Sequence, residues 1–288
     1  MAQALGTLTF RRATFDSSRT VVMGVVNVTP DSFSDGGAYG DTAAAIAHGG
    51  KLVADGADIV DVGGESTRPG APPVPVKEEA ARVLPVVRAL AGAVTVSVDK
   101  YKAEVAAAAL DAGAEIVNDV SGGTLDPELY AVVARHRAWV ILGHLRGTPA
   151  EMAAHARYTD VVSEVKRELS DRIDAAIAAG VAGARILIDP GLGFAKSGAH
   201  NLELLARLGE LGALGCPLVI GASRKSFLGA LTGRAVDDRE VATAAANTAA
   251  VLGGARVVRV HDVRAQKDAI AVADAIVRAR ASGAGRAA

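Results

Sequence analysis

Short runs of β-branched and other apolar residues alternate along the chain with longer Ala-rich segments of helical periodicity. Strands buried on both faces read as such continuous apolar runs, and the helices that cover them repeat an apolar position every three or four residues. The alternation therefore predicts βα units and a parallel sheet. We count eight units, with strands at residues 21–26, 59–62, 94–98, 116–117, 139–142, 186–188, 218–220 and 257–260.

Helical patterns fill the intervals, and four of them are followed by glycine, which commonly ends a helix. The clearest patterns cover residues 42–54, 77–91, 103–112, 127–136 and 159–179. No linker, low-complexity block or charge run divides the sequence. Uninterrupted units of this kind predict an α/β fold, a (β/α)8 TIM barrel in a single domain of residues 1–288. We expect a hairpin at residues 8–15, within an N-terminal extension of residues 1–18, and a frayed tail at residues 282–288.

A polar side chain stands at the C-terminal end of every predicted strand. These residues are Asn27, Asp61, Asp99, Asn118, His144, Asp189, Ser223 with Lys225, and Arg259 with His261. Asp, Asn and Ser at such a junction often only cap the next helix. Lys, Arg and His cannot cap a helix N-terminus, and a TIM barrel places its active site at this end. We therefore interpret the polar strand ends as one functional site.

Composition excludes several classes of partner and site. The chain has 31 Lys and Arg against 32 Asp and Glu, so no overall basic field attracts nucleic acid or an acidic membrane. Its single cysteine, Cys216, excludes an intramolecular disulfide and a cysteine-based zinc site. The sequence shows no signal-peptide core and no uncharged run of the roughly 18 residues that a membrane span needs. We expect a cytoplasmic protein with small-molecule ligands, without nucleic acid or membrane as partner.

The polar residues at the strand ends suit two kinds of ligand group. A pair of carboxylates with an amide and a lysine can bind a flat heterocycle with an amidine-like edge, as in a pterin. Lys225, Arg259 and His261 add positive charge for a diphosphate leaving group, and Asn27 offers a neutral oxygen for a phosphate-bound Mg²⁺. The long loops at residues 28–40 and 63–75 are rich in Gly, Pro and Ser and indicate mobile covers over the site.

Six segments resemble the dihydropteroate synthase family, in an order that spans nearly the whole chain. They are residues 23–37 (MGVVNVTPDSFSDGG), 61–70 (DVGGESTRPG), 118–120 (NDV), 189–196 (DPGLGFAK), 221–227 (GASRKSF) and 259–263 (RVHDV). The resemblance implies a homodimeric transferase of folate biosynthesis and a target of sulfonamides. Its reaction would join 6-hydroxymethyl-7,8-dihydropterin pyrophosphate to p-aminobenzoate, with Mg²⁺ as cofactor, pyrophosphate as leaving group and a cation-like pterin methylene on the way.

The resemblance also implies roles for individual residues. Those that would bind the pterin and carry the reaction are Asp99, Asn118, Asp189, Lys225 and Arg259, the last stacking on the pterin. Asn27 would serve Mg²⁺ and His261 the pyrophosphate. The residues that would surround p-aminobenzoate are Thr67, Arg68, Ser223, Phe33 and Phe194.

Three positions depart from the family pattern. Lys100 stands where Thr is usual, and Gly143 and Leu145 flank His144 where Met is usual. Because side chains alternate along a strand, we expect Lys100 to point away from the barrel mouth, near the next helix, where it lacks the capping ability of Thr. Lys100→Thr would then raise the melting temperature slightly. Alternatively, Lys100 curls over the rim toward the diphosphate. Gly143 would remove a side chain from the pterin wall.

Two other functions stay open at this point. A pterin-binding methyl-carrier or methyltransferase domain resembles this barrel and shares two Asp and one Asn for the pterin, but it would lack a diphosphate site. An inactive pterin-binding paralogue is the other possibility, supported only by Lys100 and Gly143. Incubation with both substrates and Mg²⁺, with pyrophosphate release as the readout, separates the three functions.

Overall fold

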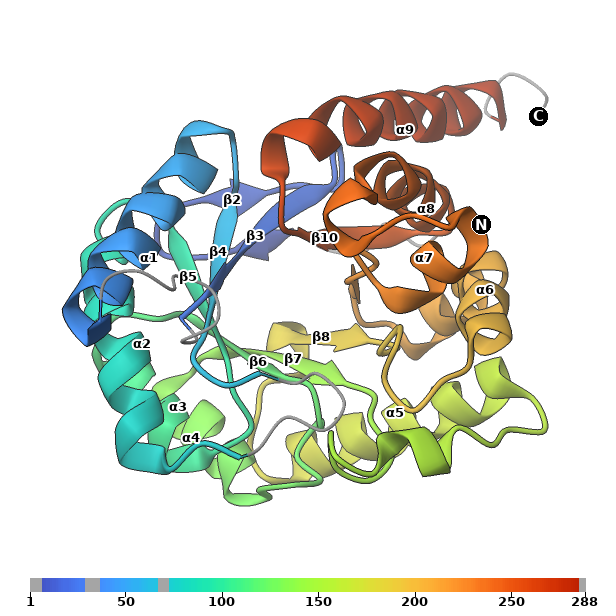
Figure 1. The fold of residues 1–288 in the computed structure, drawn as a ribbon. Helices are drawn as coiled ribbons and strands as arrows, with labels where there is room; N and C mark the ends of the chain where they lie inside the picture. The colour runs from blue at the N-terminus through green and yellow to red at the C-terminus, as the bar shows by residue number, and fades with distance from the viewer. Residues whose placement is uncertain (1–6, 29–36, 67–72, 285–288) are drawn as a thin grey trace.

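The computed structural model describes residues 7–28, 37–66 and 73–284. Eight parallel strands close into a barrel in the order β10-β3-β4-β5-β6-β7-β8-β9, and helices surround it (Figure 1). The predicted (β/α)8 fold class is thereby confirmed. The barrel strands are β3 (Val21–Asn27), β4 (Ile59–Gly63), β5 (Thr95–Asp99), β6 (Ile116–Asp119), β7 (Trp139–Gly143), β8 (Ile186–Asp189), β9 (Leu218–Ile220) and β10 (Ala255–Val260).

Helices follow the barrel strands, and the five with the clearest sequence patterns begin and end within a few residues of the expected positions. The helices are α1 (Gly37–Ala54), α2 (Val76–Leu90), α3 (Ala103–Asp111), α4 (Glu128–His136), α5 (Val161–Ala178), α6 (Gly198–Ala206), α7 (Ser226–Thr232), α8 (Glu240–Leu252) and α9 (Val263–Ala284). Helix α9 includes residues 282–284, where the sequence predicts fraying, and the remainder of that tail lies outside the described residues.

Apolar side chains fill two layers of the molecule. One layer lies inside the barrel and includes Met23, Ile59 and Ile141, while the larger one lies between the strands and the helices. Because side chains alternate along a strand, each strand supplies both layers. In β4, Ile59 and Asp61 point into the barrel, whereas Val60 packs toward the helices. The same alternation directs most of the polar residues at the strand ends into the barrel mouth.

The hairpin expected near the N-terminus is present and packs against the barrel floor. Strand β1 (Leu8–Thr9) pairs antiparallel with β2 (Thr14–Phe15). The ring of Phe10 lies 5.1 Å from that of Trp139 between centroids, and Trp139 Nε1 donates to the carbonyl oxygen of Thr9 at 3.2 Å. The hairpin therefore covers the N-terminal end of the barrel, which leaves the C-terminal end for ligands.

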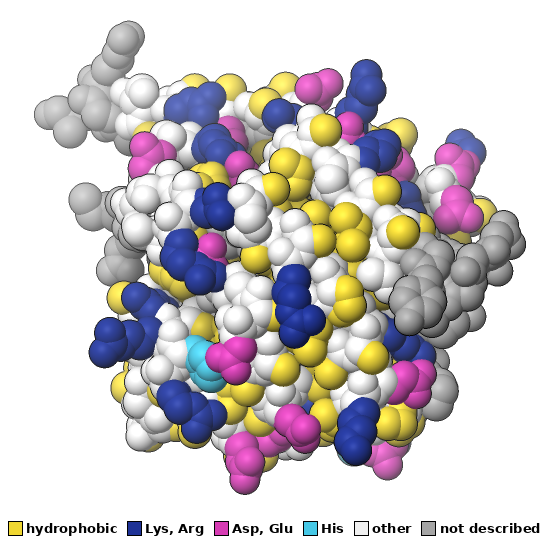
Figure 2. Space-filling view, turned by 90° about the vertical axis from the view of Figure 1, so that its left-hand side faces the viewer, with side chains coloured by type: hydrophobic (Ala, Val, Ile, Leu, Met, Phe, Trp, Pro, Cys, Tyr) yellow, Lys and Arg dark blue, Asp and Glu magenta, His cyan; other side chains and the backbone are white. Residues whose placement is uncertain are grey.

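The surface of the described residues carries charges of both signs. Figure 2 shows the side covered by α1 and α2, where basic and acidic side chains are interspersed with hydrophobic ones. This face therefore presents no extended field of a single sign.

In the described ranges, no helix combines the length and apolar character needed to cross a membrane.

Lys100 points away from the barrel mouth, as expected, but it does not lie at the start of the next helix. Its Nζ lies 2.5 Å from Oε1 of Glu79 in α2, and both side chains are 1% exposed. Lys102 contacts the other oxygen of Glu79 at 2.9 Å. The first amide of α3, that of Ala103, donates to Asp126 at 2.7 Å. The structure thus contradicts both the expected capping defect and the alternative of a cation over the rim.

Lys100→Thr is consequently expected to destabilise the protein. The substitution removes one of the two cations of a buried carboxylate, and since Lys102 remains, we expect a loss of about 1–2 kcal/mol in the free energy of unfolding. Urea denaturation followed by circular dichroism measures it. Lys51→Thr is the control, because Lys51 makes an ion pair with Asp55 while 66% exposed. Equal urea midpoints for the parent and Lys100→Thr would show that the buried pair contributes nothing to the free energy of unfolding.

Candidate active site

A cluster of charged side chains occupies the C-terminal end of the barrel. Arg259 in β10 donates from Nε to Oδ2 of Asp61 at 2.6 Å and from Nη2 to Oδ2 of Asp99 at 2.8 Å. Asn118 in β6 donates to the same oxygen of Asp61 at 3.0 Å. The other oxygen of Asp61, Oδ1, is buried and has no hydrogen-bond partner among the described residues. The cluster therefore links four strand ends and leaves an acceptor for a ligand.

Burial and neighbouring charges shift the ionisation of this cluster. Burial raises the pKa of Asp99 to about 6, because the charge of Arg259 offsets it only in part. Burial opposes the charge of Arg259, but Asp61 and Asp99 outweigh it and raise the pKa of the guanidinium. Arg259 therefore stays charged, while Asp99 changes its charge close to neutral pH.

A second group of polar side chains lies at the ends of β8 and β9. Asp189 accepts a hydrogen bond from the amide of Gly191 at 2.7 Å, and burial raises the pKa of its carboxyl group. The Nζ of Lys225 lies 4.0 Å from the ring centroid of Phe194. Burial lowers the pKa of Lys225 to about 8, with Asp189 opposing. A carboxylate and an ammonium thus face the site beside one aromatic ring.

Ser223 and His261 form a pair near the ends of β9 and β10. The Ser223 hydroxyl lies 2.9 Å from Nδ1 of His261 and accepts from the His261 amide at 3.2 Å. The hydroxyl oxygen has two lone pairs and one hydrogen, so its contact with Nδ1 fits either tautomer of the imidazole. The oxygen of Ser223 is therefore engaged by His261 in this structure.

The oxygen atoms near Gly63 have the chemistry that Mg²⁺ prefers. A Cβ atom built on Gly63 would lie 3.6 Å from Oδ1 of Asn27 and 3.7 Å from Oδ2 of Asp99, so these two oxygens border the same space. Amide and carboxylate oxygens suit a hard cation that retains phosphate and water ligands. In the part of the chain that is described, no group of three or more His, Cys, Asp and Glu side chains could hold a metal alone. Asn27 therefore fits a metal that arrives with a phosphate.

Gly143 and Leu145 do not leave a hole beside the site. A Cβ on Gly143 would come within 2.7 Å of the Cα and carbonyl oxygen of Val120, so the backbone of Val120 occupies the space of a side chain. This contradicts the expectation of a missing pterin wall at that point. Leu145 is 1% exposed and packs with Met152 and Ala195 against Phe194.

The comparisons with known proteins agree with one another on the family. Residues 23–261 match the family model of the pterin binding enzymes. The chain is 52% identical to dihydropteroate synthase of Mycobacterium leprae over 267 residues, which cover 90% of this chain and 94% of the relative. The chain belongs to the dihydropteroate synthase family. It is also 46% identical to the synthase of Synechocystis sp. over 263 residues, 90% of this chain and 91% of that one.

Solved structures of the synthase family have the same fold. The Xanthomonas albilineans dihydropteroate synthase with 4-aminobenzoic acid matches with a TM-score of 0.86 at 48% identity. The match covers 91% of this chain and 95% of that chain. This chain therefore shares the fold of that synthase.

The structure brings together most of the residues assigned from the resemblance to the synthase family. Those found at the barrel mouth are Asn27, Asp99, Asn118, Asp189, Phe194, Ser223, Lys225, Arg259 and His261. The remaining three, Phe33, Thr67 and Arg68, lie outside the described residues, as does much of both covering loops.

Two strand-end residues differ from what the sequence predicts of them. The family resemblance gives Asp61 no role, although its side chain accepts from both Arg259 and Asn118. The strand-end pattern does include Asp61 in the site, and Asp61 is also the acidic residue that opens the DVGGESTRPG segment. The strand-end pattern includes His144 in the site, but its Nε2 lies 2.9 Å from Glu168 in α5, outside the barrel. The strand alternation explains this direction, since Ile141 of β7 faces inward.

Proposed function

We infer that this chain condenses 6-hydroxymethyl-7,8-dihydropterin pyrophosphate with p-aminobenzoate, forming 7,8-dihydropteroate and pyrophosphate. The observation that carries this inference is the Arg259 guanidinium held between Asp61 and Asp99 at the mouth of a synthase-family barrel. Asn118, Asp189 and Lys225 complete a set of acceptors and donors around it.

The pterin would lie against Arg259, with its edges on the buried polar groups. Asp189 offers acceptors for the N–H donors of an amidine-like edge. The unpaired Oδ1 of Asp61 offers a further acceptor on the opposite side of the barrel. Lys225 and the amide of Asn118 can meet the ring carbonyl and ring nitrogens. Hydrogen bonds between charged groups and a ligand in a buried site fix orientation as well as affinity.

The pyrophosphate would leave toward the basic side of the mouth. Asn27 would hold Mg²⁺, which supplies neutralisation of the charge that develops on the leaving group. His261 would bind a phosphate oxygen through its ring, which the contact between Ser223 and Nδ1 orients. Preorganised donors of this kind stabilise a leaving anion without further reorganisation. The remaining positive charge on the pterin methylene is open to attack by the amine of p-aminobenzoate.

The p-aminobenzoate site would include Phe194 as an aromatic wall, with Ser223 beside it. A relative from Xanthomonas albilineans was solved with 4-aminobenzoic acid, which supports this ligand for the family. The family resemblance adds Thr67, Arg68 and Phe33, which lie outside the described residues.

One assay tests the function as a whole. Purified protein is incubated with both substrates, with Mg²⁺ or with EDTA, and pyrophosphate and dihydropteroate are quantified. We expect both products in equal amounts, and only with Mg²⁺. Transfer of a methyl group from methyltetrahydrofolate to a corrinoid, without pyrophosphate release, would replace this function with that of a methyl carrier. No product from either reaction would favour an inactive paralogue.

The pH dependence should show two limbs near neutrality. On the acid side kcat/KM for the pterin substrate falls as Asp99, with a pKa of about 6, gains a proton. On the alkaline side it falls as Lys225, with a pKa of about 8, loses its proton. Initial rates at constant ionic strength measure the profile. A profile that is flat across this interval would contradict the assigned roles of both residues.

The assembly and the cellular location stay predictions from the sequence. We infer a homodimer in the cytoplasm, as the family resemblance implies, with all 288 residues in one domain. Exposed apolar side chains on neighbouring helices support a covered face, since Val241 in α8 is 86% exposed and Val272 in α9 is 60% exposed. The molar mass of the protein in solution tests the dimer.

A further inference from the structure

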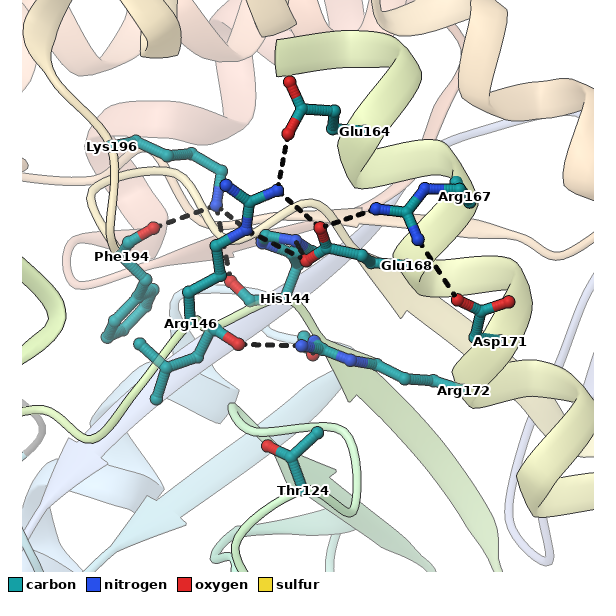
Figure 3. A network of polar contacts seen from close by, with 12 residues as sticks. Thr124, His144, Arg146, Glu164, Arg167, Glu168, Asp171, Arg172, Phe194 and Lys196 are labelled. Carbon is teal, nitrogen blue, oxygen red and sulfur yellow. Dashed lines mark hydrogen bonds and ion pairs between the residues drawn. The ribbon is translucent and has the colours of Figure 1, made fainter. Parts of the chain in front are cut away.

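A buried lysine lies directly behind the candidate active site. The Nζ of Lys196 contacts Nδ1 of His144 at 2.9 Å, the carbonyl oxygen of Phe194 at 2.9 Å and that of His144 at 3.4 Å (Figure 3). The residue is 9% exposed. Burial lowers the pKa of the Lys196 ammonium well below its usual value. The amine can donate to the two acceptors at 2.9 Å in either protonation state, since it keeps two hydrogens when neutral.

The hydrogen bonds of His144 define the direction of the whole network. Glu168 accepts at 2.9 Å from Nε2 of His144, so the imidazole proton lies on Nε2 and the lone pair of Nδ1 accepts from Lys196. Burial, with the charge of Lys196, lowers the pKa of His144 to about 3, which keeps the ring neutral. Arg146 holds Glu168 from the other side at 2.5 Å. We call Lys196, His144, Glu168 and Arg146 the Lys196 network.

The Lys196 network supports a loop with unusual backbone geometry. Between Phe194 and Lys196, Ala195 has a φ of +49°, a left-handed conformation that residues with a side chain rarely adopt. At Gly191, with a φ of +69°, a Cβ would come within 2.1 Å of the carbonyl oxygen of His144. The loop therefore lies directly on His144. The left-handed turn lets Phe194 face the site while the next-but-one side chain, Lys196, reaches beneath the loop.

The orientation of Lys225 depends on the position of this loop. Within the described ranges, the Lys225 ammonium makes no hydrogen bond or ion pair, and it contacts the face of the Phe194 ring at 4.0 Å. A hypothetical Cβ on Gly193 would lie 3.1 Å from Cδ of Lys225, so the stem of the lysine also packs on the loop. A shift of the loop would consequently move the ammonium.

We propose that Lys196 is a positioning residue for the condensation reaction, because it holds the Phe194 carbonyl in place and through the Phe194 ring orients the ammonium of Lys225. This proposal rests on the proposed function. It assigns no substrate contact to Lys196, which acts only through Phe194.

Two single variants and their combination test the proposal. Lys196→Met removes the donors but keeps the length of the side chain, and Phe194→Leu removes the ring but keeps the carbonyl that Lys196 binds. We expect each to lower kcat/KM for the pterin substrate, which Lys225 contacts in the proposed function, about tenfold, since small displacements of a positioned group have effects of this order or larger. If Lys196 acts through Phe194, kcat/KM of the double variant is also about tenfold below that of the parent, because the effects of coupled residues do not add. A multiplied, about hundredfold fall would overturn the proposal.

Amide hydrogen exchange provides a readout that does not require activity. Lys196→Met should accelerate exchange at residues 191–196, whereas Phe194→Leu should leave it close to that of the parent. Arg167→Ala is the matched control, because Arg167 is 65% exposed and touches Glu168 at 3.3 Å from the solvent side. Unchanged exchange in Lys196→Met, with a cooperative melt in every variant, would also overturn the proposal. A parent that releases no pyrophosphate would defeat the proposed function while the exchange result still reports on the loop.

Discussion

Arg259→Met is expected to lower kcat/KM for the pterin substrate by about 100- to 1,000-fold, because it removes the cation at the centre of the site. The substitution leaves Asp61 and Asp99 in one buried site without the guanidinium that both of them contact. Removing one partner of a buried ion pair also lowers the free energy of unfolding by about 3–5 kcal/mol, because the remaining charge stays unpaired. Steady-state rates with saturating p-aminobenzoate measure the loss.

The pH profile of Arg259→Met should change in a defined direction. Arg259 lowers the pKa of Asp99, so its removal raises that pKa further and moves the acid limb to higher pH. Arg259→Lys is the matched control, because lysine keeps the charge but lacks the planar fork that reaches two carboxylates. We expect an intermediate rate for the lysine variant. If the rates of Arg259→Met stay within threefold of those of the parent, Arg259 has no role in the reaction.

Asp189→Asn is expected to weaken binding of the pterin substrate about 10- to 100-fold. The amide oxygen can still accept from the Gly191 amide, as Oδ1 does at 2.7 Å, but the second acceptor becomes a donor. A pterin N–H would then face another N–H in a buried site. Isothermal titration calorimetry with the pterin substrate, in the absence of p-aminobenzoate, measures the change.

The stability of Asp189→Asn separates a binding role from a structural one. Burial raises the folded-state pKa of Asp189 above its unfolded value, so the ionised carboxylate costs stability as the pH rises through that folded-state pKa. A neutral amide removes this cost, and the melting temperature at neutral pH should stay equal or rise.

Asp119→Asn is the matched control for Asp189→Asn. Asp119 is also a buried strand-end carboxylate, but it accepts from Ser121 at 2.8 Å through the amide and at 2.7 Å through the hydroxyl. We expect this variant to lose stability and to keep its pterin affinity. Unchanged affinity in Asp189→Asn together with a lower melting temperature would make Asp189 a structural residue.

The sequence alone determined the barrel, its eight strands and most of its helices. These elements depend on local patterns, since apolar runs and helical periodicity extend over adjacent residues and glycine marks the ends. The strand pattern likewise placed Asp99, Asn118, Asp189 and Arg259 at strand ends, because each strand is recognised from a few adjacent residues. The closure of the barrel then brought these ends to one mouth.

Only the tertiary structure decided which partner each charged side chain meets. Asp61 and Arg259 lie 198 positions apart in the sequence, and no local pattern encodes their contact. The alternation along β5 predicted the direction of Lys100, but the effect of that residue depended on Glu79, which a different helix supplies. The side chain of His144 likewise points away from the site and contacts Glu168 in α5. Electrostatic energy depends on distance and burial, and both are set by the packing of elements remote in the chain.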